Sequence, residues 1–190
     1  MQDGGPYKGI EMKKLILALA PLSLVASPVL AQSASPQNLA AHDPGDRQAS
    51  IQALQATTYD LIALSQATHQ MHWNLVGPNF YQLHEMLGEF YQAQNGMFDV
   101  TAERMRALGS PADGRLTASA QQSRLPEPPV AELNGIESVR QLAAQYKAVS
   151  DRINQRIDAT GDSDPSSQDV LIDASRMIDK QLWMLTAHLR

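Results

Sequence analysis

Apolar residues recur at spacings of three and four along most of the chain after position 46, which is the period of an amphipathic helix. This pattern predicts four long helices, over residues 46–75, 80–108, 136–160 and 164–189. Short breaks at Gly77-Pro78 and around Gly161 separate the first helix from the second and the third from the fourth. Each of these pairs should therefore be antiparallel. No stretch shows the alternation of polar and apolar residues that is typical of a strand.

Residues 112–135 connect the second and third helices and contain three proline residues and several turn-forming pairs, too many breaks for one long element. Residues 116–122 predict one short helix inside this connection. Four long helices with short connections at both ends and one long crossover indicate an all-α fold, a ferritin-like four-helix bundle whose crossover carries a short helix. We expect this domain to occupy residues 47–190.

The amino-terminal segment has the order of a bacterial secretory signal peptide. Met12 precedes Lys13 and Lys14, an apolar run follows over residues 15–25, and small residues lead to a cleavage site after Ala31. The run is too short to span a membrane, which takes about 20 apolar residues; a retained amphipathic anchor is the alternative. We expect residues 1–31 to hold upstream residues and the signal peptide, and the protein to be exported, to the periplasm.

Residues 1–11 fit no part of a signal peptide, and our hypothesis is that they are a translated ribosome-binding region before a true start at Met12. Cleavage after Ala31 would remove 31 of the 190 residues and leave 159. It would also remove three basic and two acidic residues, which changes the formal charge from -5 to -6. Residues 32–46 are small and polar with two prolines, and predict a flexible tail.

Composition narrows the chemistry that the chain can perform. Hydrophobic residues make up 43% of the sequence and charged residues 18%, which argues against general disorder. The absence of cysteine excludes disulfides, thiolate metal sites and cysteine nucleophiles. The negative charge disfavours binding to nucleic acid.

The candidate metal ligands are histidines near the first turn and carboxylates later on the second helix: His69, His72, His84, Asp99 and Glu103. Asp99 and Glu103 are four residues apart and share one helix face. The usual metal site inside a ferritin-like bundle needs a Glu-x-x-His motif on two helices. None of the five histidines has glutamate three residues before it, so that site is not expected.

His84 and Asp99 lie about 22 Å apart along one helix but point to roughly the same side. They could share a metal ion only if a second copy of the helix ran antiparallel across a two-fold axis. Such a site would combine imidazoles of one chain with carboxylates of the other, a ligand set that suits Fe(II), with Zn(II) as a possible substitute. The alternative is an ordinary solvated helix face with an ordinary hydrogen-bonding histidine.

Two sequence motifs on the predicted helices resemble those of a known family. The first, H-W-N-x-x-G-x-x-F-x-x-L-H, begins at His72, and the second, D-x-x-A-E-R-x-x-x-L-G, begins at Asp99. Both resemble the Dps family of mini-ferritins in residue type and spacing, and Leu182-Trp183 lies in a stretch that is similar to the family's last helix. The resemblance covers about residues 47–190.

The resemblance implies a homo-oligomer, a hollow dodecamer built on two-fold dimers. It also implies a ferroxidase that oxidises Fe(II) with hydrogen peroxide and stores the ferric mineral. The implied ligands are His72 and His84 of one subunit with Asp99 and Glu103 of its two-fold partner. The rival functions are a non-catalytic metal-binding cage and a DNA-binding nucleoid protein.

Other residues have implied roles with ordinary alternatives. Trp73 would intercept a stray oxidising equivalent, or only pack at the dimer interface, and His69 would support a ligand by hydrogen bonding. Acidic residues around the start of the last helix would line an iron-entry pore, although capping of the helix explains the first of them equally well: Asp164, Asp169 and Asp173.

The sequence departs from the family at two places. Gly88 stands where many members carry an acidic residue, which would deplete a second iron position or leave it to water. Residues 32–50 contain one basic residue, Arg47, where DNA-binding members have lysine-rich tails. DNA is therefore an unlikely partner.

Overall fold

The computed structural model describes residues 43–190. The predicted signal peptide and most of the predicted tail lie outside these residues. The elements are α1 (Pro44–Asn74), β1 (Leu75–Val76), α2 (Phe80–Ala107), α3 (Leu116–Ser123), β2 (Leu133–Asn134), α4 (Gly135–Thr160), the 3-10 turn η1 (Gly161–Ser163) and α5 (Pro165–Ala187). The four long helices and the short crossover helix that the apolar pattern predicts are therefore confirmed.

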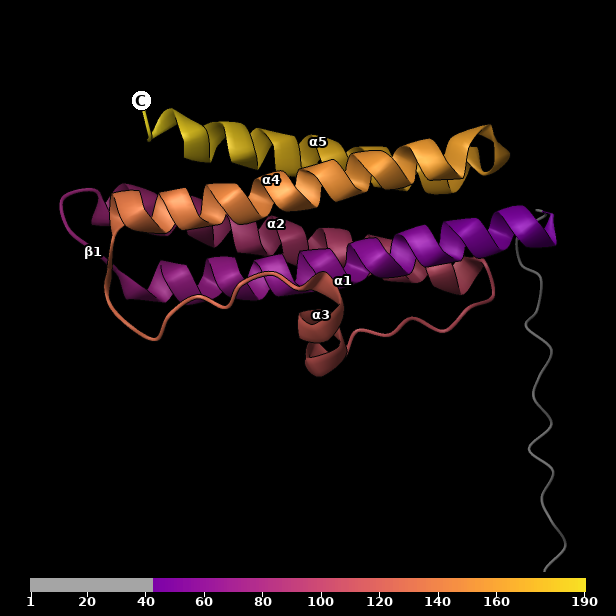
Figure 1. The fold of residues 1–190 in the computed structure, drawn as a ribbon, viewed down its shortest axis with the longest axis horizontal. Helices are drawn as coiled ribbons and strands as arrows, with labels where there is room; N and C mark the ends of the chain where they lie inside the picture. The colour runs from indigo at the N-terminus through magenta and orange to yellow at the C-terminus, as the bar shows by residue number, and fades with distance from the viewer. Residues whose placement is uncertain (1–42) are drawn as a thin grey trace, which may run out of the picture. The chain divides into compact units, whose positions relative to one another are not determined.

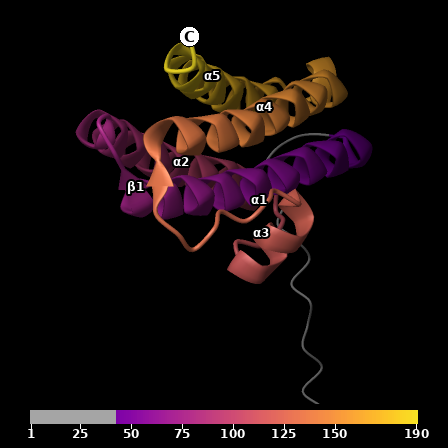
Figure 2. The same ribbon diagram turned by 60° about the vertical axis from the view of Figure 1, so that its left-hand side comes forward.

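The long helices form two antiparallel pairs. Helix α1 packs against α2, α4 packs against α5, and the two pairs lie against each other as layers (Figures 1 and 2). The crossover from α2 to α4 returns along the outer side of α1, where it carries α3 (Figure 1). This is the all-α four-helix bundle expected from the sequence, with one long crossover.

The helix ends follow the local sequence, with one difference at the start. Helix α1 begins at Pro44, earlier than the expected helix start at residue 46 and the expected domain start at residue 47. Proline suits the first turn of a helix, because its missing N–H would have had no partner there. Asn134 and Asp164 cap α4 and α5 as side-chain acceptors of backbone N–H groups.

The bundle interior is a packed apolar core. Fully buried members of the main cluster come from all four long helices: Leu61, Leu64, Leu83, Leu87, Leu142, Val149, Ile153, Ala174, Ile178 and Leu185. A second cluster, which contains Leu54, Met105, Leu108 and Leu171, fills the end of the bundle where α1 begins. This core fixes the long helices against each other and so sets the positions of the residues at both ends.

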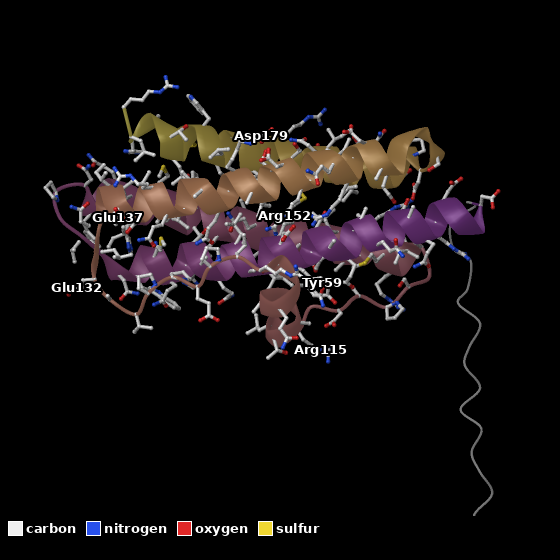
Figure 3. The ribbon with its side chains drawn as sticks, viewed as in Figure 1. Tyr59, Arg115, Glu132, Glu137, Arg152 and Asp179 are labelled. Atoms are coloured by element: carbon white, nitrogen blue, oxygen red, sulfur yellow. The ribbon has the colours of Figure 1, made fainter. Side chains whose placement is uncertain are left out.

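A buried ion-pair network joins α1 to α4. Asp60 is 1% exposed and accepts from Arg152 and from Arg156, each at 2.7 Å. Arg152 projects from α4 toward α1 (Figure 3) and also donates to the carbonyl oxygen of Ser123 at the end of α3. Two guanidinium groups compensate the buried charge of Asp60, which would otherwise be costly.

Two short strands that the sequence analysis missed tie the turn between α1 and α2 to the start of α4. Leu75 and Val76 pair in parallel with Leu133 and Asn134. Strands of two residues are too short to show an alternating pattern, so the prediction of no strand was wrong here. Gly135 follows directly, and a Cβ atom added to it would lie 2.5 Å from Leu83 Cδ1. The start of α4 therefore lies against the start of α2.

Polar contacts fasten the first part of the crossover to α1. The side chain of Gln55 both donates to the carbonyl oxygen of Asp113 and accepts from its N–H, each at 2.8 Å. Tyr59 donates to the Asp113 carboxylate, and Arg115 pairs with the same group (Figure 3). Hydrogen bonds from Arg115 hold the pKa of Asp113 well below its usual range.

Candidate metal site at the α1–α2 turn

His72 and His84 lie face to face across the turn that joins α1 to α2. His72 is in the last turn of α1 and His84 is near the start of α2. Their rings stack with centroids 3.7 Å apart and planes 18° from parallel. Gly77, at φ +104°, adopts a conformation that other residues rarely take and lets the chain reverse direction here.

Each imidazole is held by the backbone of the other residue. Nδ1 of His72 lies 2.7 Å from the carbonyl oxygen of His84, and Nδ1 of His84 lies 3.1 Å from the carbonyl oxygen of His72. A carbonyl oxygen only accepts, so each Nδ1 carries the proton and donates. In the neutral ring Nε2 then keeps its lone pair, which is the state that a metal ligand needs.

The protein environment favours this neutral state at His72. Burial lowers the pKa of His72 and the charge of His84 adds to the lowering, while the hydrogen bond to the His84 carbonyl and the nearby Glu85 act in the opposite direction. The net effect is a pKa below the ordinary value of 6.5. His72 therefore stays neutral at pH 7 and can bind a metal ion without first losing a proton.

Further aromatic rings surround the two histidines. His69 stacks with Tyr91 at 3.9 Å and 17°, and contacts Trp73 at 3.9 Å. Tyr91 also meets His72 edge-on, with centroids 5.5 Å apart. In the part of the chain that the structure describes, His69 meets its neighbours through ring contacts and makes no hydrogen bond to His72. Trp73 is 62% exposed, so it remains open to a neighbouring subunit.

Gly88 lies directly beneath the His72 ring. It is buried, and a Cβ atom added to it would lie 3.4 Å from His72 Cε1 and 3.6 Å from its Nδ1. These are contact distances rather than clashes, so this place holds no side chain but would accept one. An acidic side chain at position 88 would begin at the edge of a candidate ligand.

Asp99 and Glu103 do not join the histidines within one chain. Both are exposed on α2, which runs unbroken from Phe80 to Ala107, so His84 and Asp99 are about 22 Å apart along its axis. Among residues 43–190, no group of three or more histidine and acidic side chains is close enough to hold a metal ion. Within one chain, the described residues place the predicted histidine ligands at the start of α2 and the predicted carboxylate ligands toward its end.

The acidic residues at the start of α5 differ in their surroundings. Asp164 is fully buried, accepts from the Ser167 N–H as the cap of α5 and pairs with Arg104 at 2.9 Å. Burial acts to raise its pKa, but hydrogen bonds from Ser167 and Ser50 and the charge of Arg104 outweigh burial and lower it. A carboxylate that lines a pore must face solvent, and Asp164 does not. Asp164 is therefore the cap of α5, the alternative role that the sequence also allowed. Asp169 and Asp173 are exposed and stay predicted pore residues.

The centre of the bundle holds neutral polar side chains instead of metal ligands. Each long helix contributes one: Thr68, Gln94, Tyr146 and Gln181. Thr68 and Gln94 both hydrogen-bond the Tyr146 hydroxyl, and Gln94 also donates to Gln181. Complete burial raises the pKa of Tyr146, so its phenol stays protonated. These groups offer no carboxylate or imidazole to a cation.

Sequence reasoning missed two features of the site. The reciprocal hydrogen bonds of His72 and His84 depend on how the turn closes, which the spacing alone does not show. Tyr91 had a detectable signal, since it lies seven residues after His84 and therefore two turns further along the same helix face.

Within residues 43–190, no helix has the length and apolar character that crossing a membrane would require.

Comparison with known proteins indicates the same family as the two sequence motifs. A family model described as a ferritin-like domain matches residues 51–190. DNA protection during starvation protein 2 of Deinococcus radiodurans is 36% identical over 145 residues, which cover 76% of this chain and 60% of the relative. The DNA protection during starvation protein of Agrobacterium fabrum is 35% identical over 131 residues, which cover 68% of this chain and 81% of the relative.

Solved structures of Dps proteins are similar to this chain in both fold and sequence. Dps92 from Deinococcus radiodurans superposes with a TM-score of 0.75 at 36% identity, covering 77% of this chain and 88% of that one. Dps from Microbacterium arborescens in the high iron form gives 0.73 at 31% identity, covering 77% and 96%. The motifs of the α1–α2 turn, the bundle and these matches together show that the chain belongs to the Dps family of ferritin-like proteins.

Proposed function

We propose that the protein is an iron-storage mini-ferritin that oxidises Fe(II) with hydrogen peroxide and keeps the ferric product inside a hollow homo-oligomer. The observation that carries this proposal is the locked pair of His72 and His84, whose Nε2 lone pairs are free for a metal ion. Neutral imidazoles combined with carboxylates suit Fe(II), and Zn(II) would compete for the same ligands. Iron is here the substrate of the reaction.

The carboxylates of the site come from a second subunit. Asp99 and Glu103 are exposed at the end of α2 far from the histidines, and one chain cannot bring the two groups together. A two-fold axis that sets two α2 helices antiparallel would place the carboxylates of each beside the histidines of the other, twice per dimer. Six such dimers would form the dodecamer that the family resemblance implies.

Each group has a defined task in this mechanism. The histidines bind Fe(II) through Nε2, and the carboxylates neutralise part of the charge that increases when Fe(II) becomes Fe(III). Two ferrous ions supply the two electrons that convert hydrogen peroxide to water, so no hydroxyl radical is released. Asp169 and Asp173, exposed on α5, would attract cations toward an entry pore.

The test is peroxide-dependent Fe(II) oxidation in His72→Ala and Asp99→Ala, with the oligomer checked by light scattering. Both variants should lose the reaction while they keep the assembly. The matched controls are His188→Ala, which removes a histidine at the end of α5, and Asp158→Ala, which removes an exposed carboxylate of α4. Unchanged rates in both site variants would remove the assignment. A non-catalytic cage would bind iron but show no turnover in the wild-type protein.

Export to the periplasm and the lack of DNA binding are further parts of this proposal, and the signal peptide and most of the tail on which they depend lie outside the described residues. Mass spectrometry of the product of the native gene should find a mature chain that begins after Ala31. A gel-shift at low salt should leave DNA unretarded. Retarded DNA would instead favour the nucleoid function.

A further inference from the structure

A groove lies between α4 and the part of the crossover that follows α3. Its volume is about 510 Å³, and residues 124–127 of the crossover form one wall. The α4 residues of the other wall recur at spacings of three and four and therefore share one helix face: Gln141, Ala144, Gln145, Ala148 and Arg152. Eleven residues of helix give the groove a length of about 16 Å along α4. A volume of this size is typical of sites for small ligands.

Two arginines lie at one end of this groove. Nη1 of Arg152 donates to the carbonyl oxygen of Ser123 at 2.6 Å, and Arg124 is the next residue along the crossover. The same Nη1 also donates to Asp60, whereas Nε and Nη2 of Arg152 have no hydrogen-bond partner among the described residues. The guanidinium of Arg124 likewise pairs with no side chain within residues 43–190. Two guanidinium groups with unused N–H donors suit a carboxylate.

The backbone of Arg124 points to a role for its side chain. Arg124 ends α3 in the left-handed region, at φ +51° and ψ +27°. It is the one residue other than glycine with a positive φ in the described part of the chain. Glycine is the residue that helix ends favour in this conformation. Arginine is less stable here than glycine, and a function of the guanidinium would explain its presence.

The groove is acidic further along α4. Nε2 of Gln145 donates to the carbonyl oxygen of Pro126 at 3.2 Å, and the next residue, Glu127, lines the groove. Gln145 precedes Arg152 by seven residues, which is about 10 Å along the helix axis. Gln145 is 5% exposed, and its Oε1 is buried without a hydrogen-bond partner. An unpaired buried acceptor is unfavourable, and it favours a ligand that carries an N–H donor to the floor of the groove.

The distance between the two charged regions determines the length of a matching ligand. An extended peptide advances about 3.3 Å per residue, so three residues span about 10 Å. A single amino acid has both charges on one carbon atom and is too short. The wall between the charged regions is apolar and built of Leu125, Ala144 and Ala148. It has room for small apolar side chains.

We propose that the groove binds a short extended peptide of about three residues with free ends. Its terminal carboxylate pairs with Arg124 and Arg152, and its terminal ammonium pairs with Glu127. A peptide N–H group supplies the donor that Oε1 of Gln145 lacks. The residues proposed to bind iron do not line the groove, so this site is separate from the metal site.

The test is equilibrium dialysis of the assembled protein against trialanine and three related compounds. Trialanine amide lacks the carboxylate, acetyl-trialanine lacks the ammonium, and alanine has both charges but is too short. Trialanine should bind once per subunit, and each of the other compounds should bind at least tenfold more weakly. The proposal is wrong if trialanine does not bind, or if the four compounds bind equally.

Variants of the two charged regions locate the bound peptide. Arg124→Gly suits the left-handed backbone, so it should raise the melting temperature while it weakens trialanine binding at least tenfold. A loss of binding in a more stable protein cannot come from unfolding. Lys147→Ala removes an exposed cation of α4 outside the groove and should bind as wild type does. If Arg124→Gly also binds trialanine as tightly as wild type, the peptide does not lie in the groove.

The acidic region has its own matched pair of variants. Glu127→Gln should weaken the binding of trialanine but not that of acetyl-trialanine, which has no ammonium. Glu132→Gln removes an exposed acid of the same crossover outside the groove and should change neither. Equal effects of Glu127→Gln and Glu132→Gln would overturn the orientation of the peptide. Peroxide-dependent Fe(II) oxidation should be unchanged in all four variants, because the groove and the metal site are separate.

Discussion

His72 and His84 donate their Nδ1 hydrogens to each other's backbone carbonyl oxygens, so the fold of one turn fixes the tautomer of both rings. A histidine ligand often depends on a separate residue to orient it. Here the backbone of the two proposed ligand residues performs that task, and their orientation needs no further side chain. The fold of the α1–α2 turn would therefore also set the geometry of the proposed metal site.

The lowered pKa values of two half-buried histidines make stability depend on pH. Burial lowers the pKa of His69 and of His72 below the ordinary 6.5, so between the two values the unfolded chain binds more protons than the folded one. The free energy of unfolding should then be insensitive to these groups above about pH 6.5 and should fall as the pH drops through and below it. Urea unfolding of the metal-free protein at fixed concentration measures this, and His69→Gln should flatten the dependence. A stability that rises on acidification across this range would contradict the assignment.

Replacing Gly88 with an acidic residue should increase the binding of Fe(II). Because a Cβ atom at this position would touch the His72 ring at 3.4 Å without a clash, Gly88→Asp should fold and place a carboxylate at the edge of the site. We expect it to bind more Fe(II) per subunit than the wild type in anaerobic titration. Gly88→Ala provides the control for the added bulk and should leave the iron stoichiometry unchanged. Equal stoichiometry in all three proteins would show that position 88 does not face the iron.

The pair between Arg104 and Asp164 should be a major contributor to stability. Asp164 is fully buried and Arg104 is 17% exposed, and removing one partner of a buried pair costs about 3–5 kcal/mol. Arg104→Ala should lower the free energy of unfolding by that order, as measured by chemical denaturation. Arg140→Ala breaks an exposed pair with Glu137 and should cost at most about 1 kcal/mol. Similar losses in the two variants would mean that burial of Asp164 does not matter.

Gly135 and Gly96 form a matched pair of helical glycines. A Cβ atom at Gly135 would lie 2.5 Å from the buried Leu83, whereas one at Gly96 meets nothing within 4 Å. Gly135→Ala should destabilise by about 1–3 kcal/mol through overpacking, and Gly96→Ala should stabilise by about 0.5–1 kcal/mol because alanine favours the helix. Melting curves of both variants test this, and a stable Gly135→Ala would show that the start of α4 can move away from α2.

The long helices could be predicted from the sequence because their apolar period is local and their connections are short. The nearness of His72 to the α1–α2 turn followed from the same pattern. The burial of Asp164 and Asp60 did not, because each depends on an arginine more than fifty residues away in the chain. The pairing of Leu75 with Leu133 likewise arises only when helices and crossover are packed together.

The central claim, that the site is shared between two subunits, is tested most directly by mixing two inactive chains. His72→Ala and Asp99→Ala are co-expressed with different tags, and oligomers that carry both tags are purified and assayed for peroxide-dependent Fe(II) oxidation. A dimer with one chain of each kind has one site with both defects and one intact site, so random pairing predicts about one quarter of the wild-type rate. Each variant alone should show none. If the mixed oligomers are as inactive as the separate variants, the ligands do not come from two subunits and the account is wrong.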